Sequence, residues 1–136
     1  MCGIVGYVGA KECTAILVNS LTKLEYRGYD SAGIAVFEGD RIKTVKAKGK
    51  LKDGLIEKLS HEPHFTATAG IGHTRWATHG EPSDINSHPI GNGRVSIVHN
   101  GIIENYRKLK EFLISKGYGF ESQTDTEAVA KLLDYN

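Results

Sequence analysis

The sequence has few cysteines and prolines, no long apolar run and almost no net charge. Its 136 residues include two cysteines and three prolines, and 17 basic side chains nearly balance 16 acidic ones. Two cysteines are too few for a disulfide framework, and no apolar run approaches the length of a membrane span. A net charge of +1 supports neither a nucleic-acid partner nor an acidic substrate. The lysines between residues 43 and 52 have no aromatic residues among them, so they indicate a solvated surface.

Metal-binding spacings and a leader segment are also missing. Six histidines occur, but no two have the spacing of ligands on one helix turn, and the two cysteines are not a close pair. We therefore expect no metal and no cofactor. No signal peptide precedes Cys2. Because thiols stay reduced in the cytosol, we expect a cytoplasmic protein with no nucleic-acid and no membrane partner.

The most informative feature present is a cysteine directly after the initiator methionine. Methionine is normally removed before a small residue, which would leave Cys2 with both a thiol and a free α-amine. Such an amine has a pKa of about 7.7–8.0, so near neutral pH part of it can accept the proton of the thiol. The start of the chain then predicts a nucleophile with its own general base. The alternative is that Cys2 is only a small apolar residue at the start of a strand.

Hydrophobic periodicity predicts one domain of short strands and amphipathic helices. Strands are expected over residues 3–8, 32–37, 41–47, 68–74, 94–99 and 118–121. Helices are expected over residues 12–25 and 51–60, on the face that carries Tyr106, Leu109 and Leu113, and from residue 124 onward. The buried stripe of the first helix is expected to consist of Cys13, Leu17, Leu21 and Leu24.

Local signals refine these boundaries. Glu38-Gly39-Asp40 predicts a hairpin, residues 80–93 read as a loop, and Gly117 predicts the end of a helix. Thr124 and Glu127 have the spacing of a capping box. No stop signal follows, so we expect the last helix to be cut off and residues 1–136 to be the front part of a longer domain.

Polar residues suited to attack on an amide carbonyl occur at several points along the chain. The negative charge that develops on the carbonyl oxygen needs fixed donors, and Asn100-Gly101 at a strand end offers a side-chain amide beside a backbone N–H. For an amino-acid substrate, Arg75 offers a planar fork to the carboxylate and Asp125 a counter-charge to the ammonium. Each has an ordinary alternative: a surface ion pair for Arg75, a plain turn for Asn100-Gly101 and a solvated carboxylate for Asp125.

Longer motifs connect these residues to a known family. The chain resembles the class II glutamine amidotransferases, which have the N-terminal-nucleophile hydrolase fold. The residues that carry this resemblance are Cys2 to Gly6, Leu24 to Gly33, His73 to Gly80 and His99 to Asn105. The resemblance implies an α+β fold, an α/β/β/α sandwich with mainly antiparallel sheets that would be incomplete at the C-terminus.

The resemblance also implies a role for each site residue. Cys2 would be the nucleophile, its α-amine the general base, and Asn100 with Gly101 the oxyanion hole. Arg75 would bind the carboxylate of glutamine and Asp125 its amine. Trp76, Thr78 and His79 would belong to a loop that closes over glutamine. Arg27 and Gly28 would order the surroundings of the nucleophile.

Two segments indicate a branch of the family. Tyr26 to Tyr29 and Arg75 to Thr78 differ from the His-Arg-Gly-Gln and Arg-Tyr-Ser-Thr usual in amidophosphoribosyltransferases. They resemble the branch that supplies ammonia to sugar isomerase domains, which make glucosamine 6-phosphate from fructose 6-phosphate. Those domains would be absent from residues 1–136. Two alternatives stay open: an inactive module that binds glutamine or self-associates through an open sheet edge, and the glutaminase part of an amidophosphoribosyltransferase.

Overall fold

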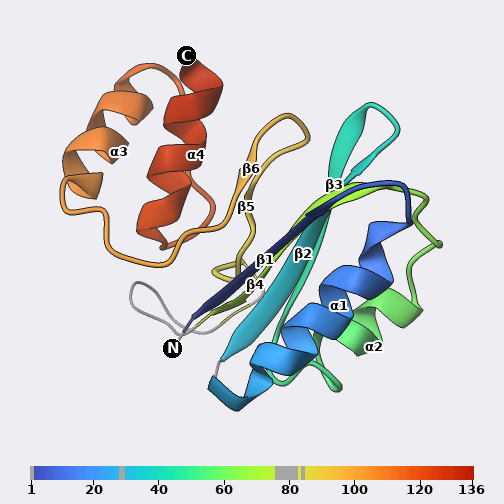
Figure 1. Ribbon diagram of the computed structural model, residues 1–136. Helices are drawn as coiled ribbons and strands as arrows, with labels where there is room; N and C mark the ends of the chain where they lie inside the picture. The colour runs from blue at the N-terminus through green and yellow to red at the C-terminus, as the bar shows by residue number, and fades with distance from the viewer. Residues whose placement is uncertain (1, 28–29, 76–82, 84) are drawn as a thin grey trace.

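The computed structural model of the chain describes residues 2–27, 30–75, 83 and 85–136. The described strands are β1 (Gly3–Val8), β2 (Ser31–Glu38), β3 (Arg41–Lys48), β4 (Ala69–Arg75), β5 (Ile90–Gly91) and β6 (Ser96–Ile97). The helices are α1 (Cys13–Leu24), α2 (Leu55–Ser60), α3 (Tyr106–Ser115) and α4 (Asp125–Tyr135), and a 3-10 turn, η1 (Glu25–Arg27), follows α1 (Figure 1).

The main sheet has the strand order β1-β4-β2-β3, and every pair in it is antiparallel. The β2–β3 hairpin closes where Glu38 pairs with Arg41, as the turn signal predicted. Gly39 there has φ +67°, a conformation that glycine adopts without strain. In the register of the sheet, Gly3 of β1 pairs with Thr74 of β4. The start of the chain therefore lies beside the end of β4.

Helix α1 covers one face of this sheet, and the core lies between them. Cys13, Leu17 and Leu21 are at most 1% exposed, which confirms three members of the predicted stripe, whereas the fourth, Leu24, is only partly buried. Each buried leucine contributes about 2 kcal/mol through the removal of apolar surface from water. Gly72 lets the helix approach closely, because a Cβ there would lie 2.8 Å from Val5 Cγ2 and 3.3 Å from Leu21 Cδ1.

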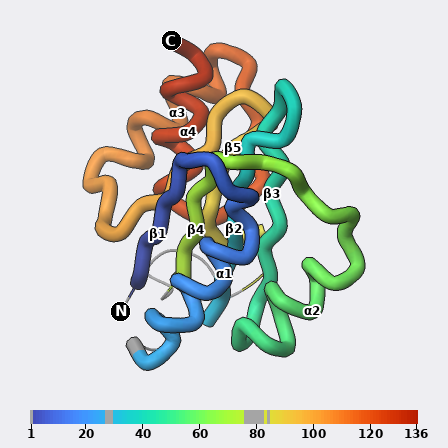
Figure 2. Tube along the Cα trace, turned by 45° about the vertical axis from the view of Figure 1, so that its right-hand side comes forward, coloured from blue at the N-terminus to red at the C-terminus, as the bar shows by residue number. Residues whose placement is uncertain are grey.

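The other side of the sheet carries the β5–β6 hairpin and the last two helices. Figures 1 and 2 show α1 and α2 on one side of the main sheet and α3 and α4 on the opposite side. Helices α3 and α4 pack against each other, and α4 also contacts β5 and β6. This order of layers, with antiparallel strands between two helical layers, confirms the predicted α+β class. None of the helices in the described ranges combines the length and hydropathy needed to cross a bilayer.

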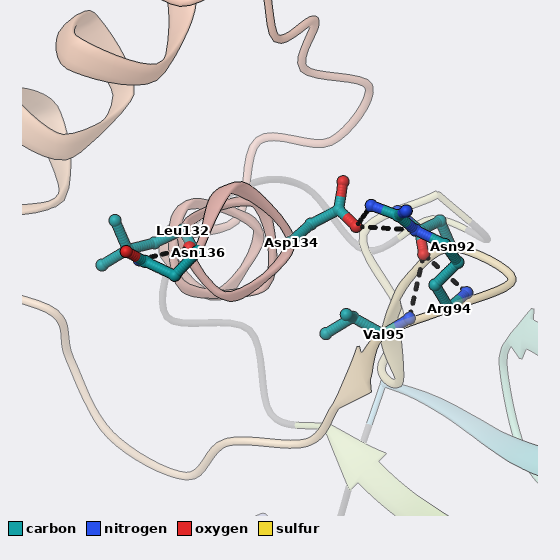
Figure 3. A network of polar contacts seen from close by, with 6 residues as sticks. All are labelled: Asn92, Arg94, Val95, Leu132, Asp134 and Asn136. Atoms are coloured by element: carbon teal, nitrogen blue, oxygen red, sulfur yellow. Dashed lines mark hydrogen bonds and ion pairs between the residues drawn. The ribbon is translucent and has the colours of Figure 1, made fainter.

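The β5–β6 hairpin corrects two expected boundaries. Strand β5 lies inside the expected loop 80–93, and β6 is shorter than the expected strand 94–99. The reason is the turn at Asn92, whose Oδ1 accepts hydrogen bonds from the N–H groups of Arg94 (2.8 Å) and Val95 (2.9 Å) (Figure 3). Arg94 in turn forms an ion pair with Asp134 of α4, which fixes the hairpin to that helix.

Two further expectations are wrong in detail. Helix α2 begins at Leu55 instead of residue 51, because residues 51–54 form turns. Residues 118–121 form no strand; instead, the Glu121 N–H donates a hydrogen bond to Glu127 Oε2 at 2.9 Å. The carboxylate of Glu127 also accepts from the N–H (2.6 Å) and hydroxyl (2.7 Å) of Ser122. Thr124 is the N-cap residue of α4, but the predicted capping box is wrong, because the Thr124 side chain makes no cap hydrogen bond and the Glu127 carboxylate binds Glu121 and Ser122 instead.

Candidate active site

Segments from distant parts of the sequence meet at one end of the main sheet. Cys2 immediately precedes β1, Arg75 ends β4, Gly101 follows β6, and Asp125 is the first residue of α4. Together with five further residues of the same region, they line one small cavity: Cys2, His73, Arg75, His88, His99, Gly101, Thr124, Asp125 and Thr126. The antiparallel pairing of β1 with β4 explains why the start of the chain reaches Arg75.

Arg75 supplies a buried positive charge to this cavity. Its exposed fraction is 3%. Burial lowers the pKa of the guanidinium, while the nearby charges of Asp30, Cys2 and Asp125 act to raise it. An arginine has no accessible neutral form near neutral pH, so it remains a cation here. The same interactions show that the thiol of Cys2 and the carboxyl groups of Asp30 and Asp125 lie near Arg75.

Asp125 brings a buried carboxylate to the same cavity. It is 3% exposed, and its Oδ2 accepts a hydrogen bond of 2.6 Å from the Ile103 N–H. This bond fixes the segment that follows Gly101 against the start of α4. The first turn of a helix also favours a negative charge, because the helix dipole is positive there. The cavity therefore contains one fixed cation and one fixed anion.

Asn100 and Gly101 lie where β6 has ended and before α3 begins. The Asn-Gly pair does not form a hairpin, which confirms the expectation that a helix follows. Gly101 has φ +152°, and a Cβ there would lie 3.1 Å from His99 Nε2, so a side chain would be strained. The Oδ1 atom of Asn100 lies 2.7 Å from Nε2 of His73. Asn100 is thus anchored to a residue that lines the cavity.

Two stacked histidines lie next to Asn100. The rings of His73 and His88 lie 4.3 Å apart with an interplanar angle of 21°. Both side chains are buried, at 0% and 4% exposed. Burial is the main cause that lowers the pKa of His73 to about 4 and that of His88 to about 2. Both rings are therefore neutral at physiological pH.

The segment that carries His88 is held tightly against the sheet. The ammonium of Lys46 donates hydrogen bonds to the carbonyl oxygens of Ile85 (3.1 Å), Ser87 (2.9 Å) and Pro89 (3.3 Å). Gly33 pairs with Lys46 on one side and with His73 on the other. A Cβ at Gly33 would overlap the carbonyl oxygen of His88 and lie 2.7 Å from Lys46 Cβ. This glycine allows the segment to settle directly on the strand.

The sequence identified part of this site. The structure brings Cys2, Arg75, Gly101 and Asp125 to one cavity and ties Asn100 to its wall. Arg27 is the last residue of η1. Gly28, Trp76, Thr78 and His79 lie outside the described residues. In the sequence, His73 and His88 stand out only as possible metal ligands or, for His73, as part of a motif. No sequence pattern predicts that their rings stack. Among the described residues, no group of three or more His, Cys, Asp or Glu side chains is arranged to hold a metal ion.

Comparison with known proteins finds relatives of this chain in sequence and in fold. A family model described as "Glutamine amidotransferase domain" matches residues 60–135. Curated proteins named glutamine–fructose-6-phosphate aminotransferase [isomerizing] match 99% of the chain, at 61% identity in Clostridium tetani and 58% in Clostridium perfringens. The chain spans 22% of the length of each of these two relatives.

Solved structures share the fold. A glutamine phosphoribosylpyrophosphate amidotransferase from B. subtilis, complexed with ADP and GMP, aligns with a TM-score of 0.80 at 27% identity, over 100% of this chain and 30% of that one. A second structure, titled as the allosteric regulatory enzyme of purine biosynthesis, aligns with a TM-score of 0.82 at 27% identity, again over 100% and 30% of the two chains.

Proposed function

The chain belongs to the glutamine amidotransferase family, and on this basis we propose that it hydrolyses glutamine to glutamate and ammonia through a thioester on Cys2. The observation that carries the proposal is the convergence of Cys2, Arg75, Gly101 and Asp125 on one cavity. A thiol, a cation, an anion and a strand-end backbone amide are the groups that an amino acid with a side-chain amide requires.

The proposed chemistry begins at the terminus. After loss of Met1, the α-amine of Cys2 accepts the thiol proton, and the thiolate attacks the side-chain carbonyl of glutamine. The oxygen that becomes negative receives hydrogen bonds from the Asn100 amide and the Gly101 N–H. As the C–N bond breaks, the ammonium of Cys2 gives its proton to the leaving amide nitrogen, which departs as ammonia and leaves a thioester. The same amine then deprotonates a water molecule that attacks the thioester; the C–S bond breaks, glutamate is released, and the proton returns to the Cys2 sulfur.

Recognition of glutamine follows from the two fixed charges. Arg75 would take the α-carboxylate through paired N–H donors, and Asp125 would face the α-ammonium. Both side chains are 3% exposed, so little solvent screens their interaction with a ligand. By family likeness we assign Trp76, Thr78 and His79 to a loop that closes over glutamine, and Arg27 and Gly28 to ordering the surroundings of Cys2.

We propose that the ammonia serves glucosamine 6-phosphate synthesis from fructose 6-phosphate. The support is the name of the curated relatives, glutamine–fructose-6-phosphate aminotransferase, at identities up to 61%. Residues 1–136 would then be the N-terminal part of the glutaminase domain, with sugar isomerase domains as the partners that consume ammonia. An amidophosphoribosyltransferase shares the fold at 27% identity, which supports that acceptor less strongly.

Location and assembly are further parts of the proposal. Cys2 and Cys13 are not joined in a disulfide, and a nucleophilic thiol must stay reduced, which favours the cytoplasm. Strand β1 is one edge of the main sheet, and its Ile4 (46%) and Val8 (82%) are exposed. Such an edge favours self-association, which light scattering of the 136-residue chain would detect as a mass above that of the monomer.

The test uses the full-length protein that contains this chain. An electrophilic glutamine analogue should add once, on Cys2, and intact-mass analysis should show that Met1 has been removed. Cys2→Ala should abolish ammonia release and labelling while leaving the circular dichroism spectrum unchanged, and Cys13→Ala is the matched control that keeps both. Ammonia release by Cys2→Ala, or by protein that retains Met1, would contradict the mechanism.

A further inference from the structure

We propose that His73 is a positioning residue that orients the side-chain amide of Asn100, so that its nitrogen and not its oxygen faces the carbonyl under attack. This inference rests on the glutamine hydrolysis proposed above. A primary amide has two ends of nearly the same shape, and only the nitrogen end can donate a hydrogen bond to a developing oxyanion. An asparagine without an anchor would present either end.

The hydrogen bond between the two side chains defines both orientations. Nε2 of His73 lies 2.7 Å from Oδ1 of Asn100. Because a carbonyl oxygen only accepts, Nε2 must carry the hydrogen, and in a neutral ring Nδ1 is then the bare nitrogen. Since Oδ1 is held at His73, the Nδ2 group lies on the other side of the amide. Donation to Oδ1 also polarises the amide and strengthens Nδ2 as a donor.

His73 is rigid enough for this role. It lies on β4, is 0% exposed, and stacks on His88 at 4.3 Å. Its neutral state also avoids a second positive charge beside Arg75, two residues further along the same strand. The ring therefore remains in one place and one tautomer while the substrate binds and reacts.

The support beneath His73 extends across the sheet. Lys46 of β3 holds the segment of His88 through the carbonyl oxygens of Ser87 (2.9 Å) and Pro89 (3.3 Å). Gly33 lies between Lys46 and His73 in the register and leaves room for that segment. Residues of three strands, β2, β3 and β4, therefore support the position of the Asn100 amide, although Asn100 itself follows β6.

A purely structural role for His73 predicts different behaviour from a positioning role. A core-filling ring is replaced best by an apolar side chain, whereas a positioning ring is replaced best by a donor at the place of Nε2. The side chain of glutamine carries its nitrogen about as far from the backbone as Nε2 of histidine. Asparagine carries its nitrogen only as far as Nδ1. His73→Gln and His73→Asn are therefore a matched pair of equal polarity and different reach.

Steady-state glutamine hydrolysis by the full-length protein gives the first readout. Loss of one oxyanion donor typically lowers kcat by about 100- to 1,000-fold, and loss of its orientation should remove part of that. We expect His73→Leu and His73→Asn to lower kcat by about ten- to a hundredfold with KM for glutamine within about threefold. His73→Gln should stay within about fivefold of the wild-type kcat.

Two further measurements separate positioning from packing. In an Asn100→Ala background, His73→Asn should change kcat by less than about twofold, because the residue through which it acts is gone. The aldehyde analogue of glutamine, which forms a tetrahedral adduct with Cys2, should bind His73→Asn more weakly by the same factor as kcat falls. Binding of glutamate should stay unchanged.

The outcomes distinguish this inference from the proposed function. If the wild-type protein neither hydrolyses glutamine nor labels at Cys2, the proposed function fails and this inference with it. If the wild type is active and His73→Gln is as slow as His73→Asn, or both match the wild type, the positioning role alone is overturned. Additive losses in the Asn100→Ala background would overturn it as well.

Discussion

Gly33 leaves no space for a side chain beside His88: a Cβ on the glycine would overlap the carbonyl oxygen of the histidine. The contact is between backbones, so a rotamer change cannot relieve it. The close approach is what lets the segment of His88 settle on β2 and places the histidine ring against His73.

Gly33→Ala should therefore destabilise the protein. Overpacking of this kind costs about 1–3 kcal/mol, and the shift of the segment should also separate the stacked rings. Urea unfolding monitored by circular dichroism measures the change in free energy. Gly6→Ala in β1 is the matched control, because a Cβ there meets only the Gly70 carbonyl oxygen at 3.9 Å. A loss of stability no greater than in Gly6→Ala would contradict the packing described.

Lys46→Met should release the same segment from the other side. The substitution keeps most of the aliphatic stem but removes the charged donor of three hydrogen bonds to carbonyl oxygens. Hydrogen bonds to charged groups contribute about 1.5–3 kcal/mol each but are not additive here, so we expect a loss of about 2–4 kcal/mol in unfolding free energy. Lys43→Met, an exposed position on the same strand, should change it by less than about 0.5 kcal/mol.

Acid should weaken the fold in a defined window. The pKa of His73 falls from 6.5 to about 4 on folding, and that of His88 to about 2. Below pH 6.5 the unfolded chain binds protons at these positions while the folded chain does not, so acidification favours unfolding. The slope should approach about 1.4 kcal/mol per pH unit for each histidine.

Urea titrations at pH 7.5, 6.5 and 5.5 measure this slope. His88→Gln should reduce it by about 1.4 kcal/mol per pH unit at most. Stability that stays constant from pH 7.5 to 5.5 would show that the two rings are not held neutral by burial.

Arg75→Lys should raise KM for glutamine more than the retained charge suggests. A guanidinium can bind a carboxylate through two parallel N–H bonds, and an ammonium cannot reproduce that geometry. We expect KM to rise by at least about tenfold, with a smaller change in kcat. Arg94→Lys, whose ion pair with Asp134 lies away from the cavity, is the control. Equal KM values for the Arg75→Lys variant and the wild type would rule out a direct contact with substrate.

Local patterns in the sequence predicted the strands and helices that have strong periodicity. Strand 3–8, the helix carrying Leu17 and Leu21, and the Glu38–Asp40 hairpin were all confirmed, because their signals lie within a few residues of one another. The strand expected over residues 118–121 was wrong. The N–H of Tyr118 donates to the carbonyl oxygen of Leu113 and the N–H of Glu121 to the carboxylate of Glu127, and no strand pattern reveals these partners.

In the candidate site, too, some features could be predicted from the sequence and others could not. Contiguous motifs predict Cys2, Arg75, Asn100 and Gly101 as site residues, and Asp125 is predicted separately, as a counter-charge to the ammonium of an amino-acid substrate. The pairing of His73 with Asn100 and its stacking on His88 could not be predicted, because they depend on the register of three strands and on a glycine that admits a crossing segment.

The register that pairs Gly3 with Thr74 has a practical consequence for anyone who produces this protein. Residue 2 lines the cavity, so any affinity tag, linker or fusion partner attached ahead of it would emerge at that cavity and block the α-amine. The last residue of α4 lies at the far end of the molecule (Figure 1). Purification handles and fluorescent labels therefore belong away from residue 2.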